Sequence, residues 1–415
     1  MLSPICRGIP HKTQRKAYAK PNGYTKPPCI PKIEVLNSPL RKKEVTAMFP
    51  LDQLDTPSLL VDLDVMEENL GKMQNFATQN RVNLRPHTKA HKVPEIALQQ
   101  IRRGAKGICV AKLGEAEVML KGGVSDILIT TPIANLQKIQ RLITIRKQYP
   151  DARVIQVIDD KKHAELINDA AMEAHVSVDL LIEVESGQQR CGVEPGTELL
   201  PLIKVINALP NVRYIGIQAY SGHLQHVKSF QERKLLARAA VEPVFSFIQN
   251  HLTNPELRPE IVSGGGSGTY NMYEGLPFTE LQAGSYLFMD WAYHTVEAAN
   301  GDPIYSDFGC ALKVWTTVIS HPKRNRAIVD AGMKCLSVDS GMPVVEGYSD
   351  IVYTTGGDEH GILSLNGNKP LSIGDKLAII PSHCDTTLGQ FSMLYGVRNG
   401  LVETQWCIQG RGRSD

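Results

Sequence analysis

The stretch LRPHTKAHK, residues 84–92, gathers titratable nitrogens at the end of a strand-like run. It contains His87, Lys89, His91 and Lys92. A lysine held at the mouth of a barrel is partly desolvated, which lowers the pKa of its amine and makes the neutral form available to form a Schiff base. The alternative is that both lysines are solvated loop residues. The stretch is therefore a candidate covalent site, and its own composition leaves both interpretations open.

A run of glycines follows another strand-like segment, in VSGGGSGTY at residues 262–270. Successive glycines allow backbone N–H groups to converge on an anion, and the loops after strands seven and eight of a barrel are the usual phosphate site. A flexible turn is the alternative. A Schiff-base lysine at one strand end and a phosphate-binding loop at another together suggest pyridoxal phosphate.

Further polar side chains follow two other strand-like runs. EVESGQQRCGV places Arg190 in a loop bounded by glycines, and AYSGHLQH presents Tyr220, His223 and His226. Arginine could contact an anionic ring oxygen, and Tyr or His could face a cofactor ring or act as a base. Taken singly, each of these side chains could equally be a surface or structural residue.

The segment PSHCDTT near the end of the chain contains His383 and Asp385 at H-x-D spacing. Alternate residues of an extended segment point the same way, so this imidazole and this carboxylate could share one divalent ion. Cys384 would then point away and is not assigned as a ligand. Two ligands alone are a weak signal, because His and Asp are common near turns.

A scaffold that brings strand ends together is predicted from the hydrophobic pattern. From residue 58 onward, short apolar runs alternate with amphipathic stretches of helical period, which indicates βα units and a parallel sheet. After an opening strand at 58–62, eight strand-like runs favour a (β/α)8 TIM-type barrel over an open doubly wound sheet. These runs lie at 82–87, 107–111, 126–131, 153–158, 179–184, 214–220, 260–265 and 279–284.

The pattern changes past residue 300, where β-branched runs are broken by Gly, Asp and Asn without long helices. This spacing predicts a separate β domain. We therefore divide the chain into a leader at 1–47, a barrel at 48–300 and a C-terminal β domain at 301–415.

The leader is rich in Lys, Arg and Pro and has few acidic residues, so we expect it to be disordered rather than packed into a core. It is either an organelle transit peptide or an over-long translation start, because Met48 directly precedes the first ordered-looking segment.

Composition limits the function classes. The 415 residues carry a formal charge of +2, so no global field would hold the protein on nucleic acid or on an acidic membrane. The eight cysteines are scattered without a CxxC pair, as expected for free thiols. No apolar run approaches the ~20 residues that span a bilayer. We expect a cytoplasmic protein, or one imported through residues 1–47, that acts on small molecules.

Taken together and in order, RPHTKAHK, EVESGQQRCGV, AYSGHLQH, VSGGGSGTY, TELQAGSYLFMD, GDEHG and PSHCDTT resemble the D-threonine aldolase and D-serine dehydratase family, the metal-dependent branch of the alanine-racemase-like pyridoxal phosphate enzymes. The resemblance covers nearly the whole chain except the leader. It implies a barrel followed by a β domain, a homodimer, and a D-amino acid substrate.

The resemblance also implies roles for individual residues. Lys89 corresponds to the lysine that binds the cofactor, and Lys92 becomes an outer-shell residue. Arg190 falls where relatives contact the phenolic oxygen of pyridoxal, and Tyr220 lies close to the cofactor. The phosphate-binding loop is implied to contain Ser263, Gly265 and Gly266.

The metal pair of the family is His383 followed by Asp385. Dehydratases typically show Cys at the second position, a soft ligand suited to zinc, whereas an Asp oxygen also suits manganese or magnesium and favours the aldolase side. The expected reaction is cleavage of D-threonine or a related D-3-hydroxy-amino acid to glycine and an aldehyde, with His223 removing the β-hydroxyl proton.

Four alternatives stay open, one of which is a racemase or decarboxylase on the same fold that would need no metal. Another is a D-serine dehydratase, in which Lys89 abstracts the Cα proton, and a third is a D-3-hydroxyaspartate aldolase or dehydratase. The non-enzyme alternative is a pyridoxal phosphate-binding homeostasis protein, but that type is a lone barrel, so the β domain argues against it.

Overall fold

Eight parallel strands form the first sheet of the protein, seen in a computed structural model that describes residues 48–366 and 371–415. Their order is β3-β10-β9-β8-β7-β6-β5-β4, and an isolated parallel bridge between His87 and Cys109 joins the two end strands. The predicted (β/α)8 barrel and its eight strand positions are therefore confirmed. The strands are β3 (Asn83–Leu84), β4 (Ile108–Val110), β5 (Asp126–Ile129), β6 (Arg153–Ile158), β7 (Val178–Glu183), β8 (Val212–Ala219), β9 (Ile261–Gly264) and β10 (Glu280–Leu281).

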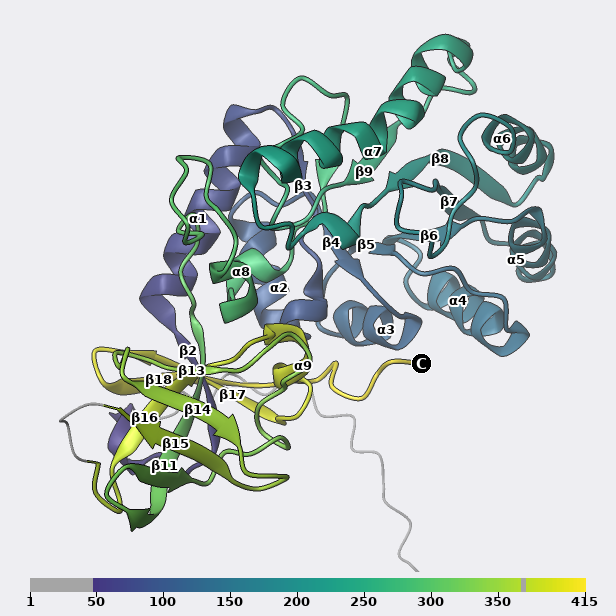
Figure 1. The fold of residues 1–415 in the computed structure, drawn as a ribbon. Helices are drawn as coiled ribbons and strands as arrows, with labels where there is room; N and C mark the ends of the chain where they lie inside the picture. Colours follow the sequence, from purple (N-terminus) through teal and green to yellow (C-terminus); the bar gives the residue numbers. More distant parts are fainter. Residues whose placement is uncertain (1–47, 367–370) are drawn as a thin grey trace, which may run out of the picture. The chain divides into compact units, whose positions relative to one another are not determined.

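Amphipathic helices cover the outside of this sheet (Figure 1). Polar side chains fix where several of them begin: Asn135, Asp160 and Ser229 each accept a hydrogen bond from a backbone N–H of the first turn. The α-helices are α1 (Leu63–Gln79), α2 (Pro94–Arg102), α3 (Leu113–Lys121), α4 (Leu136–Gln148), α5 (Lys161–Ala174), α6 (Leu199–Ala208), α7 (Phe230–His251), α8 (Trp291–His294) and α9 (Cys384–Leu388). Short 3-10 turns are η1 (Leu51–Gln53), η2 (Thr88–Ala90), η3 (Gly222–Leu224) and η4 (Ser285–Leu287).

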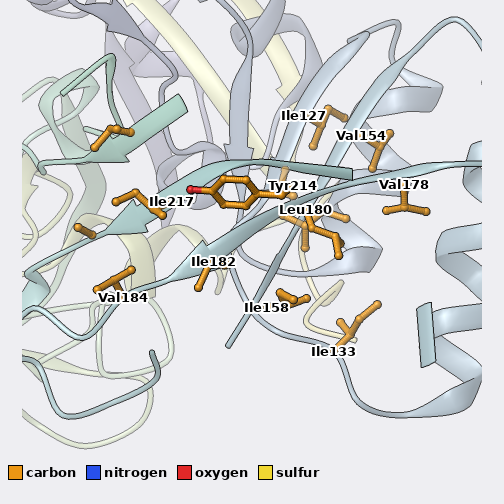
Figure 2. Close-up of a cluster of buried hydrophobic side chains, with 14 of the residues drawn as sticks. Ile127, Ile133, Val154, Ile158, Val178, Leu180, Ile182, Val184, Tyr214 and Ile217 are labelled. Atoms are coloured by element: carbon orange, nitrogen blue, oxygen red, sulfur yellow. The ribbon is translucent and has the colours of Figure 1, made fainter. Parts of the chain in front are cut away.

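The core between strands and helices is aliphatic. Figure 2 shows Val154, Leu180, Ile182 and Ile217 among the side chains of this cluster, and each of these four is 2% exposed or less. Burying such side chains is the main favourable contribution to folding, at about 1.5–3 kcal/mol for each large aliphatic residue. The strands are thereby held in a fixed register, which positions the residues at their carboxyl ends.

The interior of the barrel is layered. At the amino-terminal end of the strands, the fully buried Arg85 donates to Glu280 (2.8 Å) and Asp126 (2.6 Å). A separate apolar cluster fills the middle and includes Cys109, Leu128, Ile155, Val157, Leu181, Ile215 and Ile261. Nearer the carboxyl ends the interior becomes polar. The layering follows the usual filling of an eight-stranded barrel, where a packed core lies beneath the site.

A bulge in β8 changes which side chains face this interior. Regular pairing with β7 is interrupted after Tyr214, so that Leu181 lies opposite Gly216. Ile215 belongs to the interior cluster, whereas Ile217 belongs to the helix-facing one. Residues two apart on a regular strand share a face, so the bulge is what reverses the alternation. Gln218 consequently faces the interior.

The second sheet has ten strands, and all but two of them come from the C-terminal part of the chain. The predicted β domain is thus present. The strands are β1 (Phe49–Pro50), β2 (Ser58–Asp62), β11 (Leu312–Lys323), β12 (Arg326–Val329), β13 (Val344–Val345), β14 (Ile351–Thr355), β15 (Gly361–Leu365), β16 (Lys376–Ile380), β17 (Met393–Arg398) and β18 (Leu401–Cys407).

The opening strand β2 joins this second sheet rather than the barrel. Leu60 pairs with Tyr395 of β17, and Leu59 pairs with Val314 of β11 (Figure 1). The sequence pattern predicts a strand here, but a strand's partner depends on contacts far along the chain. The domain boundary at residue 300 remains a prediction. Strands β1 and β2 precede this boundary but pair with β11, β17 and β18, which follow it.

The predicted leader, residues 1–47, lies outside the described residues. Among residues 48–366 and 371–415, every helix is too short or too polar to cross a lipid bilayer.

Candidate active site

Lys89 lies in the short turn η2, directly after the first barrel strand. The turn is fixed by Thr88, whose hydroxyl donates to the Cys109 carbonyl (3.0 Å), and by the Lys89 N–H, which donates to Nδ1 of His87 (3.3 Å). The Lys89 ammonium donates to Oδ2 of Asp385 at 2.6 Å. The structure therefore brings together the predicted cofactor lysine and a predicted metal ligand, which are 296 residues apart in sequence.

The charge state of Lys89 differs from the expectation. Desolvation alone would lower the pKa of the amine, but the Asp385 carboxylate is the larger influence and raises that pKa above its ordinary value. Burial in turn pushes the pKa of Asp385 upward, yet the Lys89 charge and hydrogen bond hold it down at about 2. The expected neutral amine is thus replaced by an ion pair, because a close opposite charge outweighs partial burial.

The other titratable residues of the LRPHTKAHK stretch pack around this turn. Lys92 pairs with Glu115 at 2.7 Å, and Nδ1 of His91 accepts from the Val93 N–H at 3.1 Å. Burial, followed by the Lys89 charge, lowers the pKa of His87 to about 3. His87 is therefore a neutral imidazole at physiological pH.

His383 and Asp385 do not lie on an extended segment. His383 is the N-cap residue of α9, and Asp385 lies in the first turn of that helix. The prediction that both residues lie on one extended segment is therefore wrong, because a helical turn begins at Cys384. A carboxylate in a first helical turn is favoured by the free N–H groups there. Cys384 is buried beside Asp385, and its thiol donates to Oδ1 of Asp385 (3.4 Å).

Asp339 orients His383 and was missed in the sequence. Nδ1 of His383 donates to Oδ2 of Asp339 at 2.7 Å, which leaves Nε2 as the imidazole nitrogen available to a metal. A carboxylate on the far nitrogen is the usual support of a metal-binding histidine. Within the described residues no group of three or more His, Cys, Asp or Glu is arranged to hold a metal ion. The protein thus supplies two candidate donors and leaves the other positions open.

The loops after β7 and β8 carry the remaining predicted residues. Arg190 lies 3.6 Å from the Glu183 carboxylate and is half exposed. Tyr220 follows β8 and is close enough to Lys89 to influence its charge. The His226 ring packs on Tyr293, with ring centres 4.4 Å apart. His223 is exposed and lies over Gly187, and in the described part of the chain no hydrogen bond joins it to Lys89 or Asp385.

The glycine loop after β9 is tightly built. Gly265 has φ +71°, in the left-handed region, and a Cβ on Gly266 would approach Gln225 to 2.4 Å. The carbonyls of Gly264 and Gly265 accept from the Gln282 N–H. The N–H of Gly265 points away from those bonds, because carbonyl and N–H of a trans peptide point in opposite directions. The Gly265 N–H is therefore free for an anion, whereas the Gly266 N–H donates to the Thr269 hydroxyl (3.2 Å) and the Gly268 N–H to Gln225 (2.9 Å).

A polar network lies beneath this loop and was also missed in the sequence. Gln282 donates to both Gln218 (2.8 Å) and the Ser263 hydroxyl (2.9 Å), and Gln218 donates to Glu183. All four side chains are buried. A polar residue inside an otherwise apolar strand, as in IGIQAY and TELQAG, was the available signal. Burial raises the pKa of Glu183 to about 8, although its hydrogen bond from Gln218 opposes the shift.

Comparison with known proteins gives two family matches. Residues 61–291 match the model described as "Alanine racemase, N-terminal domain", and residues 311–397 match the "Putative serine dehydratase domain".

Relatives of similar length accompany these matches. The chain is 38% identical over 376 residues to a 3-hydroxy-D-aspartate aldolase of Paracoccus denitrificans, covering 89% of this chain and 96% of the relative. It is 37% identical over 368 residues to a D-threonine aldolase of Arthrobacter sp., covering 88% and 95%. The crystal structure of a D-threonine aldolase from Filomicrobium marinum is similar with a TM-score of 0.84 at 36% identity, covering 89% and 98%. More distant relatives are dehydratases.

Proposed function

This chain belongs to the family of the D-threonine and 3-hydroxy-D-aspartate aldolases, built on the alanine racemase N-terminal domain, and on that premise we propose that it cleaves D-3-hydroxy-amino acids to glycine and an aldehyde. It is a lyase of the carbon–carbon type. The family implies pyridoxal phosphate, and we extend the proposal to a divalent metal.

One observation carries the proposal: the Lys89 ammonium lies 2.6 Å from the Asp385 carboxylate. In the proposed assignment Lys89 holds the cofactor and Asp385 holds the metal. An aldolase must act on two neighbouring atoms of its substrate, the Cα attached to the amine and the Cβ that carries the hydroxyl. A lysine and a metal-binding carboxylate in direct contact suit a substrate of that size.

The residues present fit the cofactor. Lys89 offers an amine, and the glycine loop after Ser263 offers the unengaged N–H of Gly265, while the Gly266 N–H donates to the Thr269 hydroxyl. Arg190 and Tyr220 follow the neighbouring strands β7 and β8. Pyridoxal phosphate, when bound, accepts the electrons of the bond that breaks at Cα. The Ser263 hydroxyl accepts a hydrogen bond from Gln282 and keeps its own O–H as a donor to the proposed phosphate.

The residues present also fit a divalent metal. Imidazole and carboxylate are suitable donors for manganese, magnesium or zinc, and the Asp339 contact orients His383 for that role. Such a metal lowers the pKa of a hydroxyl bound to it. His223, exposed after β8, is the proposed acceptor of the β-hydroxyl proton. Loss of that proton from the substrate allows the Cα–Cβ bond to break.

The test is a product analysis. The purified full chain is supplied with pyridoxal phosphate and Mn²⁺ and incubated with D-threonine, D-3-hydroxyaspartate and D-serine in turn. We expect glycine with acetaldehyde from the first and glycine with glyoxylate from the second. Ammonia and an oxo acid without glycine would instead identify a dehydratase.

Two controls accompany this assay. Lys89→Ala should abolish turnover while the circular dichroism spectrum stays that of the wild type. Exhaustive EDTA treatment should remove activity that Mn²⁺ restores, and activity that survives EDTA contradicts the metal part of the proposal.

The homodimer and the cytoplasmic location expected from the sequence belong to the same proposal. Sedimentation equilibrium tests the first, and a fluorescent fusion of the full chain tests the second.

A further inference from the structure

Arg233, in the first turn of α7, is fully buried. Its guanidinium donates only to backbone carbonyls. Nε bonds to Gly268 (2.9 Å), Nη1 to Val227 (2.6 Å) and Lys228 (3.3 Å), and Nη2 to Glu297 (2.7 Å). The side chain is therefore satisfied in hydrogen bonds, but these bonds bring it no negative charge.

Within residues 48–366 and 371–415, Arg233 forms no ion pair with a carboxylate. Asp307 and Glu297 are within electrostatic range, but each is engaged elsewhere. Oε2 of Glu297 accepts from the Phe230 N–H, and Oδ2 of Asp307 accepts from the Tyr270 hydroxyl. A buried cation without a paired anion is strongly unfavourable, because its loss of hydration is not offset by a nearby negative charge. Its burial lowers the pKa of Arg233, in the direction expected for an uncompensated cation.

The carbonyl that Nε of Arg233 contacts belongs to the end of the glycine loop. The same loop is fastened from behind by other donors: the Tyr305 hydroxyl bonds to the Ser267 carbonyl, and the Tyr286 N–H bonds to the Ser267 hydroxyl, both at 2.8 Å. The Ser267 N–H takes no part in these bonds and donates to no acceptor in the described residues. Arg233 thus contacts a loop in which the N–H groups of Gly265 and Ser267 are free to bind an anion, while those of Gly266 and Gly268 are engaged by Thr269 and Gln225.

We propose that Arg233 is a positioning residue whose positive charge, acting through the peptide groups of the glycine loop, stabilises the phosphate of the bound cofactor. The inference rests on the proposed function, since it requires that this loop bind a phosphate. The hydrogen bond to Gly268 polarises that peptide and holds the loop in shape. The bound dianion in turn supplies the negative charge that the buried guanidinium lacks in the protein itself.

A purely structural role makes a different prediction. If Arg233 only fastened carbonyls, Arg233→Lys, which lacks the fork of donors, would lose the preference for pyridoxal 5'-phosphate over pyridoxal as Arg233→Gln does. If its charge acts on the phosphate, Arg233→Lys would keep that preference and Arg233→Gln would lose it. The ratio of the two dissociation constants therefore separates the two roles.

The same helix offers a matched control. Arg238 also lies on α7 and also donates to loop carbonyls, those of Met272 (3.1 Å) and Glu274 (3.0 Å), but these lie beyond the glycine loop. Arg238→Gln removes a similar set of bonds without removing charge from behind the proposed phosphate site. It should leave the ratio of dissociation constants unchanged.

The experiment uses the full chain, freed of cofactor by dialysis against hydroxylamine. Binding of pyridoxal 5'-phosphate and of pyridoxal is measured by absorbance titration for the wild type, Arg233→Gln, Arg233→Lys and Arg238→Gln. In Arg233→Gln we expect pyridoxal 5'-phosphate to bind about 10- to 100-fold more weakly, while pyridoxal binding changes less than about threefold. Arg233→Lys keeps the charge but not the fork of donors, so it should retain most of the preference for the phosphorylated ligand.

The outcomes are distinguishable. Equal losses for both ligands in Arg233→Gln, or loss of the phosphate preference in Arg233→Lys, overturn the role of the charge. If Arg233→Gln does not fold, Arg233→Lys alone decides, because a structural role predicts that it loses the preference for pyridoxal 5'-phosphate over pyridoxal. A wild-type protein that binds neither ligand contradicts the proposed function instead.

Discussion

At the level of single residues, the site depends on side chains that hold other side chains in place. His383 is held by Asp339, Lys89 is paired with Asp385, and Gln218 is bonded to Glu183. Each partner fixes an orientation or a charge state that the residue would not have alone. Two of these residues, Asp339 and Glu183, give testable predictions.

The first concerns Asp339. Asp339→Asn keeps the size of the side chain but weakens the acceptor for Nδ1 of His383, so the imidazole loses its fixed orientation. We expect about a 10- to 100-fold loss of Mn²⁺ affinity, measured by isothermal titration calorimetry. Asp358→Asn, an exposed carboxylate of the same domain, is the control and should bind Mn²⁺ like the wild type. Unchanged affinity in Asp339→Asn would show that the contact does not support a metal ligand.

The second concerns Glu183, whose pKa is raised by burial to about 8. Between its ordinary value and pH 8, the folded protein keeps a proton that the unfolded chain releases, so this group lowers stability as pH rises through that window. Glu183→Gln removes the titration.

The difference in unfolding free energy, variant minus wild type, should therefore increase from pH 5 to pH 8 in urea unfolding experiments. Glu185→Gln, on the same strand end, is the control and should show no such trend. A pH-independent difference for Glu183→Gln would mean that Glu183 titrates normally.

At the level of elements, the bulge in β8 decides which side chains reach the site. A Cβ at Gly216 would lie 1.9 Å from the Ile261 carbonyl oxygen of β9, so only glycine fits the close approach of these strands. The bulge directs Gln218 into the barrel, where it bonds to Gln282 and Glu183.

Gly216→Ala should therefore lower the free energy of unfolding by about 1–3 kcal/mol, because backbone must move to admit the methyl group. Gly71→Ala is a control of opposite sign. It lies in α1 with no atom within 4 Å of the added Cβ, so it should stabilise by about 0.5–1 kcal/mol. Urea denaturation measures both variants, and a neutral Gly216→Ala would show that β8 and β9 can separate at no cost.

At the level of the whole molecule, one hydrophobic core joins the barrel to the C-terminal sheet. Leu84 and Leu281 of the barrel strands belong to the same buried cluster as Val314 and Leu394 of the second sheet. The described residues accordingly lie in a single compact unit. Because the barrel and the second sheet share this core, unfolding of either one would expose apolar side chains of the other.

We therefore expect a single cooperative transition in calorimetry, with equal calorimetric and van't Hoff enthalpies. A fragment of residues 48–300 should fail to fold, because β2 loses its partners β11 and β17. Two separated transitions, or a soluble and folded fragment, would show that the proposed domains are independent.

The sequence by itself determined the barrel strands and most of the residue types of the site, but not Asp339 or the buried glutamines. The eight barrel strands follow from local hydrophobic patterns, and the lysine turn, the glycine loop and the H-x-D segment stand out because each is contiguous. The short helix α9 was missed, because a five-residue helix has almost no periodic pattern of its own.

Only the tertiary structure decided which of these parts meet. It paired Lys89 with Asp385, placed Asp339 on His383, put Arg233 behind the glycine loop, and assigned β2 to the second sheet. These contacts join residues from 35 to 296 positions apart. Local patterns carry no information on such contacts, because they depend on strand register, on the bulge at Gly216, and on how the two sheets share a core.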